Sequence, residues 1–360
     1  MMDYPRRLAR LRAAVAATEV SAVLVSGAAN VRYLSGFTGS QGALAVDADR
    51  ALLISDFRYR LQAAEQAPLF ELVEVERWHE GLAHALRGLG CRVVGFEPAH
   101  LTYQAHQRLV AALGNISLAP VEGLVERLRA LKGPQEIALM ERAAAVSDGA
   151  MARVISLVRP GVSERELALA AESYIKREAD AEIAFPPIIA AGPRSAQCHA
   201  EPGTRELAAG DLVVIDLGAR WQGYGADLTR TAVVEAADAQ RRDIYAACRE
   251  AQTAARAGVR AGADCAALDA IARGIIAGAG YGEYFGHGLG HGVGIEAHEA
   301  PRLSPTADGS LAAGMTVTIE PGIYLPGVGG VRLEDLVVVT EEGHRALTHA
   351  PLAPELPALG

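Results

Sequence analysis

The sequence predicts two domains that both mix helices with strands: an α/β domain over residues 1–130 and a second domain over residues 131–360. The first of these stretches alternates short apolar or β-branched runs with helix-like segments, which is typical of an α/β domain. A long helical pattern then begins at Pro134, because proline is favoured at the first position of a helix, and it ends at Pro160. Half of the residues are apolar, which is enough to build two hydrophobic cores.

Strands and helices alternate along the first domain. The expected strands are SAVLVSG, GALAVDADRALLISD, ELVEVE, RVVGFEP and ISLAPVE, with a hairpin turn at residues 47–49. The expected helices are FRYRLQAAEQA, residues 79–89 and TYQAHQRLVAALG.

The second domain begins with helices and continues into strands. Ser163 and Glu166 form a capping box ahead of the apolar positions in LALAAESYI, so a second helix follows the first. The strand-like IAFPPIIAAG and the hairpin DLVVIDLGARWQGYGADLTRTAVV come next. Two alanine-rich helices are expected at 239–258 and 264–279, and glycine-rich strands occupy the rest of the chain.

Composition excludes several classes of partner. The net charge of -9, without a long Lys/Arg block, argues against nucleic acid and against an anionic membrane surface. No stretch approaches the ~20 apolar residues of a membrane span, and the N-terminus lacks the pattern of a secretory signal, so we expect a cytoplasmic protein. The four cysteines form no CxxC pair, which argues against a thiolate metal site.

The segment GHGLGHGVGIEAHEAP, residues 286–301, places His287, His291 and His298 among five glycines. Glycine costs roughly 1 kcal/mol in a helix interior, so this is not a helical metal site. An extended or looped segment, whose backbone passes close to another group, fits the glycines better.

Two acids interrupt the predicted hairpin of the second domain. Asp216 lies in the middle of an apolar strand, and Asp227 lies on the partner strand. A buried carboxylate is costly unless a partner or a metal neutralises it. Taken alone, either acid could equally cap the turn or pair with Arg230.

Two later strands carry acids in the same way. Glu320 ends the alternating run MTVTIEPGIY, and Glu334 and Asp335 stand at the head of the strand in GGVRLEDLVVV. Four such carboxylates with the imidazole of His291 form an oxygen-rich ligand set with one nitrogen. That set suits two divalent ions, with Mn(II) first and Co(II) or Zn(II) possible.

These motifs together resemble one family. AGPRSAQCHAEP, DLGARWQGYGADLTRT, HGLGHGVGIEAHEAP, TIEPGIY and GGVRLED occur in the order found in the Xaa-Pro peptidases of the pita-bread metallopeptidases, prolidase and aminopeptidase P. The likeness extends weakly to the first domain through NVRYLSGFTGSQGALAV and ISDFRYRLQA. It implies a creatinase-like α/β N-terminal domain and an α+β pita-bread catalytic domain.

The resemblance also implies roles for the ligands. Asp216 would chelate one metal ion, and Asp227 would bridge both ions. His291 and Glu320 would bind the other ion, with Glu334 as the second bridge. Glu320 is also the family's candidate for carrying the proton of the attacking water to the leaving nitrogen.

Six further residues are candidates for roles beside these ligands. His287, His298 and His199 would donate hydrogen bonds to the scissile carbonyl, to the developing oxyanion or to the proline side of the substrate. Arg332, Tyr324 and Asp335 are candidates for orienting the ligands or binding substrate.

The substrate is therefore expected to be a peptide with proline in the second position, cleaved by a homodimer. Prolidases that act only on dipeptides hold the free carboxylate with an arginine upstream of the EPG segment. Here only Arg302 is available, shifted from the expected place, which favours an aminopeptidase P over a dipeptidase. The alternatives are a pita-bread protein that binds peptides without catalysis and a methionine aminopeptidase.

Overall fold

The computed structural model describes residues 2–360, except for the side chain of Glu178. The chain divides into two compact units, unit 1 ending at Arg129 and unit 2 spanning Ala130–Gly360. The boundary expected from the sequence lies one residue further along. Within the described residues, every helix is too short or too polar to cross a membrane.

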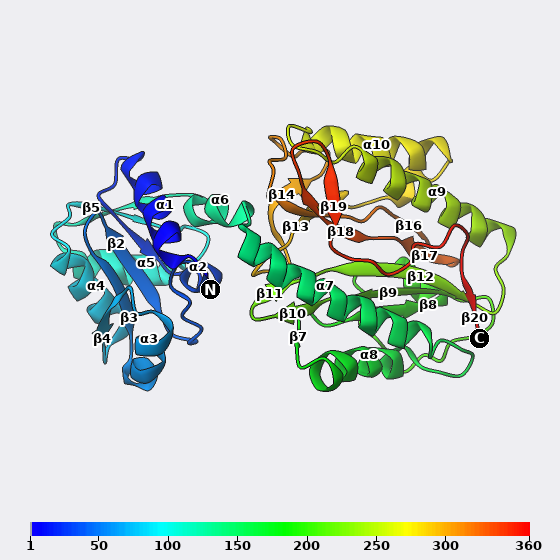
Figure 1. Cartoon of the computed structure of the whole chain (residues 1–360), viewed down its shortest axis with the longest axis horizontal. Coiled ribbons are helices and arrows are strands. Elements are labelled where there is room, and N and C mark those ends of the chain that lie inside the picture. Colours follow the sequence, from blue (N-terminus) through cyan, green and yellow to red (C-terminus); the bar gives the residue numbers. More distant parts are fainter. Residues whose placement is uncertain (1) are drawn as a thin grey trace. The chain divides into compact units, whose positions relative to one another are not determined.

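Unit 1 is built on a six-stranded sheet with the order β4-β3-β2-β1-β5-β6 (Figure 1). β1 pairs antiparallel with β2 and parallel with β5, so the sheet is mixed. The expected turn joins β2 to β3, where Asp47 accepts hydrogen bonds from the backbone of Asp49 and Arg50. The strands are β1 (Ala22–Val25), β2 (Ala43–Asp47), β3 (Ala51–Ser55), β4 (Glu71–Glu74), β5 (Val93–Phe96) and β6 (Ser117–Pro120).

Helices α4 and α5 pack on one face of this sheet. Leu86 of α4 and Leu109 of α5 share a buried cluster with Leu24 and Ile54 of the strands. The helices of unit 1 are α1 (Tyr4–Ala16), α2 (Ala28–Ser35), the short η1 (Phe57–Tyr59), α3 (Arg60–Gln66), α4 (Trp78–Gly88), α5 (Tyr103–Leu113) and α6 (Leu124–Ala130), which ends at the unit boundary.

Unit 2 begins with the two helices that the sequence predicts. α7 begins at Pro134, and the capping box of Ser163 and Glu166 begins α8. The helices of unit 2 are α7 (Pro134–Ile155), α8 (Glu164–Ser173), η2 (Tyr174–Glu178), η3 (Gly192–Ala196), α9 (Ala239–Ala257), α10 (Cys265–Gly278) and η4 (Gly282–Tyr284).

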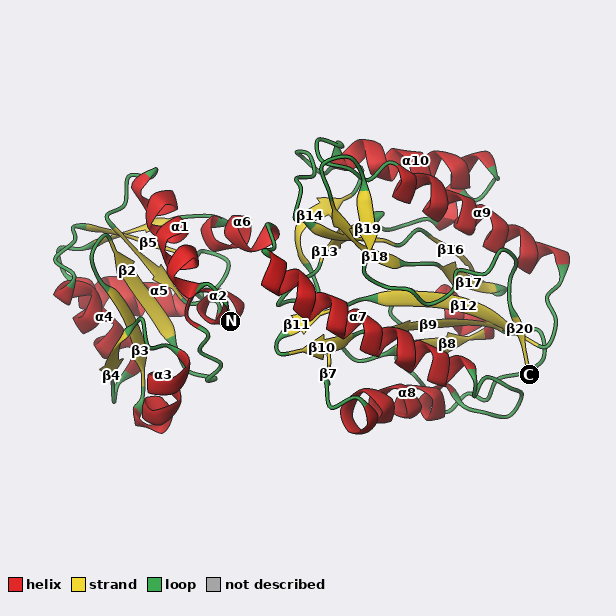
Figure 2. Ribbon diagram, viewed as in Figure 1, coloured by secondary structure: helices red, strands yellow, loops and turns green. Residues whose placement is uncertain are grey.

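The strands of unit 2 form four small sheets, and β12, β16, β17 and β18 lie between α7 and the pair α9/α10 in the ribbon view (Figure 2). The sheet orders are β11-β10-β7, β20-β12-β9-β8, β14-β13-β15-β18-β19 and β16-β17. The strands are β7 (Glu182–Ile183), β8 (Ile188–Ala191), β9 (Leu212–Leu217), β10 (Ala219–Trp221), β11 (Tyr224–Gly225), β12 (Leu228–Val234), β13 (Gly290–Gly292), β14 (Glu299–Leu303), β15 (Thr316–Ile319), β16 (Gly322–Leu325), β17 (Gly329–Arg332), β18 (Asp335–Val339), β19 (His344–Ala346) and β20 (Ala358–Leu359).

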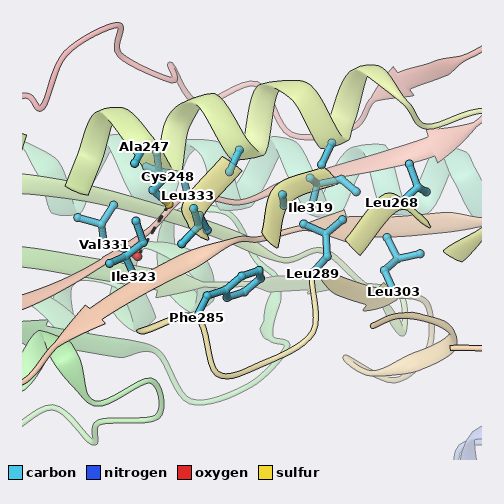
Figure 3. Packing of buried hydrophobic residues seen from close by; sticks show 14 of the residues in the cluster. Ala247, Cys248, Leu268, Phe285, Leu289, Leu303, Ile319, Ile323, Val331 and Leu333 are labelled. Atoms are coloured by element: carbon cyan, nitrogen blue, oxygen red, sulfur yellow. Dashed lines mark hydrogen bonds between the residues drawn. The ribbon is translucent and has the colours of Figure 1, made fainter. Parts of the chain in front are cut away.

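Two separate hydrophobic cores hold these layers together. One packs α7 and α8 against β8, β9 and β12, with Ile215 and Leu217 of β9 among its members. The other packs α9 and α10 against β15 to β18, and Figure 3 shows Cys248, Ile319 and Val331 within it. Each layer of strands therefore buries one face against its own helices.

Alternation along the strands leaves the opposite faces polar, because successive side chains of a strand point to opposite sides. On β9, Ile215 and Leu217 enter the α7/α8 core, so Asp216 between them points away from it. Val331 and Leu333 likewise enter the α9/α10 core, so Arg332 points the other way. The fold thus sets polar side chains between two apolar cores.

Two glycines of residues 286–301, Gly290 and Gly292, are required by neighbouring backbone. A Cβ atom on Gly290 would lie 2.1 Å from the carbonyl oxygen of Thr318, and one on Gly292 would lie 2.2 Å from that of Ala300. The prediction of an extended glycine-rich segment is confirmed, since β13 lies within it and β14 begins in it. The backbone atoms that leave no room for a Cβ belong to the adjacent strands β15 and β14.

We predict opposite effects for two glycine substitutions. Gly290→Ala destabilises unit 2 by at least about 2 kcal/mol, because the backbone of Thr318 cannot move without disrupting β15. Gly274→Ala in α10, where a Cβ meets nothing within 4 Å, stabilises by about 0.5–1 kcal/mol. Denaturant unfolding of both variants checks this, and equal stability of the two would contradict it.

Candidate metal and peptidase site

The structure brings together side chains from distant strands on the polar face of unit 2. Asp227, just before β12, His291 on β13 and Glu334, just before β18, each offer a ligand atom, and these atoms lie within 4.8 Å of one another. Asp216 on β9 pairs in register with Thr229 on β12, two residues after Asp227. All of these residues belong to unit 2.

Three carboxylates of this cluster keep one oxygen without a partner. Oδ1 of Asp216, Oδ1 of Asp227 and Oε1 of Glu334 are buried and accept no hydrogen bond. The three residues are 7%, 5% and 1% exposed. A buried carboxylate oxygen left without a partner is costly, and a cation bound among these oxygens would offset that cost.

Burial and mutual repulsion raise the pKa values of these acids. Burial first and then the charge of Asp216 raise the pKa of Asp227 well above its usual 3.8. Burial and the charge of Asp227 likewise raise the pKa of Glu334 well above 4.5. Burial also raises the pKa of Asp216, although the guanidinium of Arg332 opposes it.

His291 presents one particular nitrogen to the carboxylates. Its Nδ1 lies 3.0 Å from the carbonyl oxygen of Gly292 and, since a carbonyl only accepts, Nδ1 carries a proton. Nε2 lies 3.2 Å from Oε1 of Glu320 and 3.8 Å from Oδ2 of Asp227. Burial would lower the pKa of His291, but Glu320 outweighs it and raises this pKa to about 9. The Nε2 atom is therefore the one placed to bind a cation.

Glu320 is oriented by three neighbours. Its Oε1 accepts from Oγ1 of Thr318 at 3.2 Å and pairs with His291, and its backbone N–H donates to Leu289 at 2.8 Å. Burial pushes the pKa of Glu320 upward, yet the hydrogen bond and charge of His291 bring it below its usual value. Glu320 is thus the carboxylate of the cluster that most readily stays ionised.

A chain of hydrogen bonds runs outward from Asp216. Arg332 donates to Oδ2 of Asp216 at 2.5 Å and to the hydroxyl of Tyr324 at 2.9 Å. The Tyr324 hydroxyl lies 2.9 Å from Nε2 of His287, whose Nδ1 lies 2.8 Å from the carbonyl oxygen of Gly288. Through these contacts Arg332 and Tyr324 could orient Asp216, and their supporting role stays a prediction.

Both ring nitrogens of His287 are engaged within the protein. Nδ1 must donate to the carbonyl of Gly288, so Nε2 accepts from Tyr324. Burial lowers the pKa of His287, which keeps the imidazole neutral. In this arrangement His287 has no second N–H for a substrate, in contrast to the donor role expected from the sequence.

His298 and His199 lie at the exposed side of the cluster. The ring centroid of His298 is 4.1 Å from that of His291, and burial together with the His291 charge lowers the pKa of His298. The charge of His199 contributes to lowering the pKa values of both His287 and His298, so His199 lies within electrostatic range of both. Both His199 and His298 are exposed, so they can reach a bound molecule.

Asp335 points away from the cluster. It lies on the side of β18 that faces α9, where it pairs with Arg256 at 2.6 Å and accepts from Gln252 at 2.9 Å. It also pairs with Arg230 at 2.7 Å, and Arg230 donates to the backbone carbonyl of Glu334. Asp335 therefore reaches the site only through Arg230.

The sequence did not single out Thr229 and Thr318. Thr229 donates to Oε2 of Glu334 at 2.6 Å, and Thr318 donates to Glu320. Each lies two positions along a strand from a predicted ligand, Asp227 or Glu320, and so shares its face. That spacing is the signal that could have revealed them.

Phe285, two residues before His287, is 2% exposed and belongs to the α9/α10 core, so its side chain is not available to a substrate. Tyr284 beside it is 36% exposed.

The donor set fits divalent metal ions. Four carboxylates and one imidazole nitrogen supply hard oxygen ligands with one borderline ligand. The unpartnered oxygens of Asp216, Asp227 and Glu334 would gain a partner from a cation held between them.

We predict that Asp227→Asn stabilises the metal-free protein. A raised pKa means that the folded state binds more protons than the unfolded state, so Asp227 reduces stability as the pH rises through its raised pKa. At pH 8 the variant should melt about 2–4 °C higher than wild type, and the difference should shrink at lower pH. Scanning calorimetry in chelator measures both, with the exposed Asp308→Asn as control. A lower melting temperature at pH 8 would contradict the prediction.

Comparison with known proteins identifies the family. Residues 138–341 match the model of metallopeptidase family M24, and residues 7–131 match the creatinase/prolidase N-terminal domain. An uncharacterized peptidase, YqhT, of Bacillus subtilis is 38% identical over 350 residues, covering 96% of this chain and 98% of that protein.

Two solved structures align over nearly the whole chain. A Xaa-Pro dipeptidase from Bacillus anthracis has a TM-score of 0.95 at 38% identity, covering 99% of this chain and 100% of that one. An X-Pro aminopeptidase from Thermotoga maritima has a TM-score of 0.90 at 33% identity, covering 98% and 99%. The predicted creatinase-like N-terminal domain and pita-bread catalytic domain are confirmed, and the chain belongs to metallopeptidase family M24.

Proposed function

We propose that the protein hydrolyses the peptide bond between an N-terminal residue and proline, and that dipeptides are its preferred substrates. The observation that carries the proposal is the cluster of Asp216, Asp227, His291, Glu320 and Glu334, in which three buried carboxylate oxygens lack a partner. Both similar structures named above are described as peptidases of the Xaa-Pro type.

Two divalent ions, Mn(II) first and Co(II) or Zn(II) next, would occupy the site. Asp216 would bind one ion and His291 with Glu320 the other, while Asp227 and Glu334 would bridge. When bound, such a pair lowers the pKa of a water molecule and polarises the scissile carbonyl. The pairing of Arg332 with Asp216 and of Thr229 with Glu334 holds these carboxylates in place.

Glu320 and the exposed histidines act on the substrate. Glu320 is the ligand whose pKa is lowered, so it can take the proton of the attacking water and pass it to the proline nitrogen. His298, exposed beside His291, and the exposed His199 donate hydrogen bonds to the carbonyl oxygen as negative charge develops on it. His287 acts indirectly, by holding Tyr324 and through it Arg332.

Arg302 supports the preference for dipeptides. It lies directly opposite His291 in the β13–β14 ladder, so the two side chains project from the same face. After burial and the His291 charge, the Arg302 charge also contributes to lowering the pKa of His298. An exposed cation in this position can hold the free carboxylate of a dipeptide, although the sequence alone favoured longer peptides.

The other candidates are less well supported. A non-catalytic peptide-binding protein does not need five intact metal ligands, and a methionine aminopeptidase does not need the N-terminal unit or His199. A homodimer and a cytoplasmic location remain predictions from the sequence.

We predict metal-dependent cleavage of Xaa-Pro bonds. Protein stripped with chelator should be inactive, and added Mn2+ should restore hydrolysis of Ala-Pro, whereas Ala-Gly and Met-Ala-Ser should stay intact. Released amino acids are measured by chromatography. Failure to cleave both Ala-Pro and Ala-Pro-Ala would refute the enzyme assignment, and release of methionine from Met-Ala-Ser would favour the methionine aminopeptidase.

We predict that Arg302→Gln separates the two substrate lengths. Loss of a charge-assisted hydrogen bond should raise KM for Ala-Pro on the order of 10-fold and change that for Ala-Pro-Ala by less than about threefold. The control is Arg260→Gln, an exposed arginine elsewhere in unit 2. Equal effects on both substrates would point to an aminopeptidase.

A further inference from the structure

His199 lies in a stretch of irregular backbone. It follows η3 and precedes β9, so no strand ladder fixes its position. An exposed histidine on such a segment would sample many positions unless other contacts hold the segment. We call residues 191–203 the His199 loop.

One buried carboxylate holds both ends of the His199 loop. Glu164, at the start of α8, is 0% exposed. Its Oε1 accepts from the backbone N–H of Ala191 at 2.9 Å, and its Oε2 accepts from that of Gly203, also at 2.9 Å. Arg194, within the loop, pairs with the same carboxylate at 3.1 Å. A single side chain thus closes the loop at its base.

The N-terminus of α8 and the loop's own arginine reinforce this closure. The backbone N–H groups of Glu164 and Arg165 donate to the carbonyls of Arg205 at 3.1 Å and Gly203 at 2.9 Å. Arg194 also donates to the carbonyl of Glu201 at 2.6 Å. The bonds from Glu164 and Arg165 use N–H groups of the first turn of α8, which have no partner within the helix.

The opposite side of the loop contacts the site. Ser195 accepts from the backbone N–H of Gly330 on β17 at 2.8 Å, and Arg332 donates to the carbonyl of Cys198 at 3.3 Å. Arg332 also pairs with Asp216, so the residue before His199 is tied to a metal-ligand position.

We propose that Glu164 is a positioning residue for His199, a role that rests on the proposed function of His199 in Xaa-Pro hydrolysis. Its carboxylate fixes both ends of the His199 loop and thereby fixes where the imidazole meets the substrate. An amide in its place would present an NH2 group to one of two backbone N–H donors, so at least one bond is lost. Glu164 itself contacts neither substrate nor metal ligand.

The test is a double-mutant cycle of Glu164→Gln with His199→Ala, assayed on Ala-Pro with Mn2+. His199→Ala should lower kcat/KM on the order of 10²-fold. Glu164→Gln should lower kcat/KM roughly 10-fold. The double variant should match His199→Ala within about twofold, because the position of His199 no longer affects the rate once the imidazole has been removed. Glu166→Gln, an exposed acid on the same helical turn, is the matched control.

A second readout needs no activity. In the metal-free protein, hydrogen exchange of the peptide covering residues 191–203 should accelerate in Glu164→Gln and stay unchanged in Glu166→Gln. If Glu164→Gln does not fold, Arg194→Met, which alters a half-exposed side chain, replaces it in both measurements.

The outcomes separate the two proposals. Multiplied losses in the double variant, or unchanged exchange in the loop, would overturn the role of Glu164 while leaving Xaa-Pro hydrolysis intact. Inactive wild-type protein would instead contradict the proposed function.

Discussion

The mutual repulsion of buried carboxylates is the constraint on which unit 2 depends. Asp216, Asp227 and Glu334 are drawn together although each keeps an oxygen without a partner. Nothing in hydrophobic packing favours that arrangement, since burial raises the pKa of each of them. The cluster therefore destabilises the folded state, and a cation bound among the carboxylates would offset this destabilisation.

The two cores explain how the strain is tolerated. Helices α7 and α8 cover one layer of strands and α9 and α10 cover the other, so the polar faces are held by packing that does not involve them. Two buried arginines also hold these acids in position. Arg332 pairs with Asp216, and Arg230 donates to the backbone carbonyl of Glu334. The proposed ligands are therefore held in place by the protein itself, as a catalytic metal site would require.

Much of this was predictable from the sequence, for identifiable reasons. Pro134 and the Ser163 capping box mark helix starts by local chemistry, and an acid such as Asp216 inside an apolar strand indicates a special environment. The direction in which Asp335 points was not predictable, because it depends on which face of β18 meets α9. Nε2 of His287 is engaged by Tyr324, and this contact exists only after β16 packs beside the segment that carries His287. Long-range contacts of this kind leave no trace in local spacing.

The most direct test of the central claim is anomalous diffraction from crystals of the protein grown with Mn2+. Two peaks roughly 3.5–4 Å apart should appear among Asp216, Asp227, His291, Glu320 and Glu334, with Asp227 and Glu334 between them. A structure in which these five side chains bind no ion, or in which manganese binds elsewhere on the chain, would contradict it.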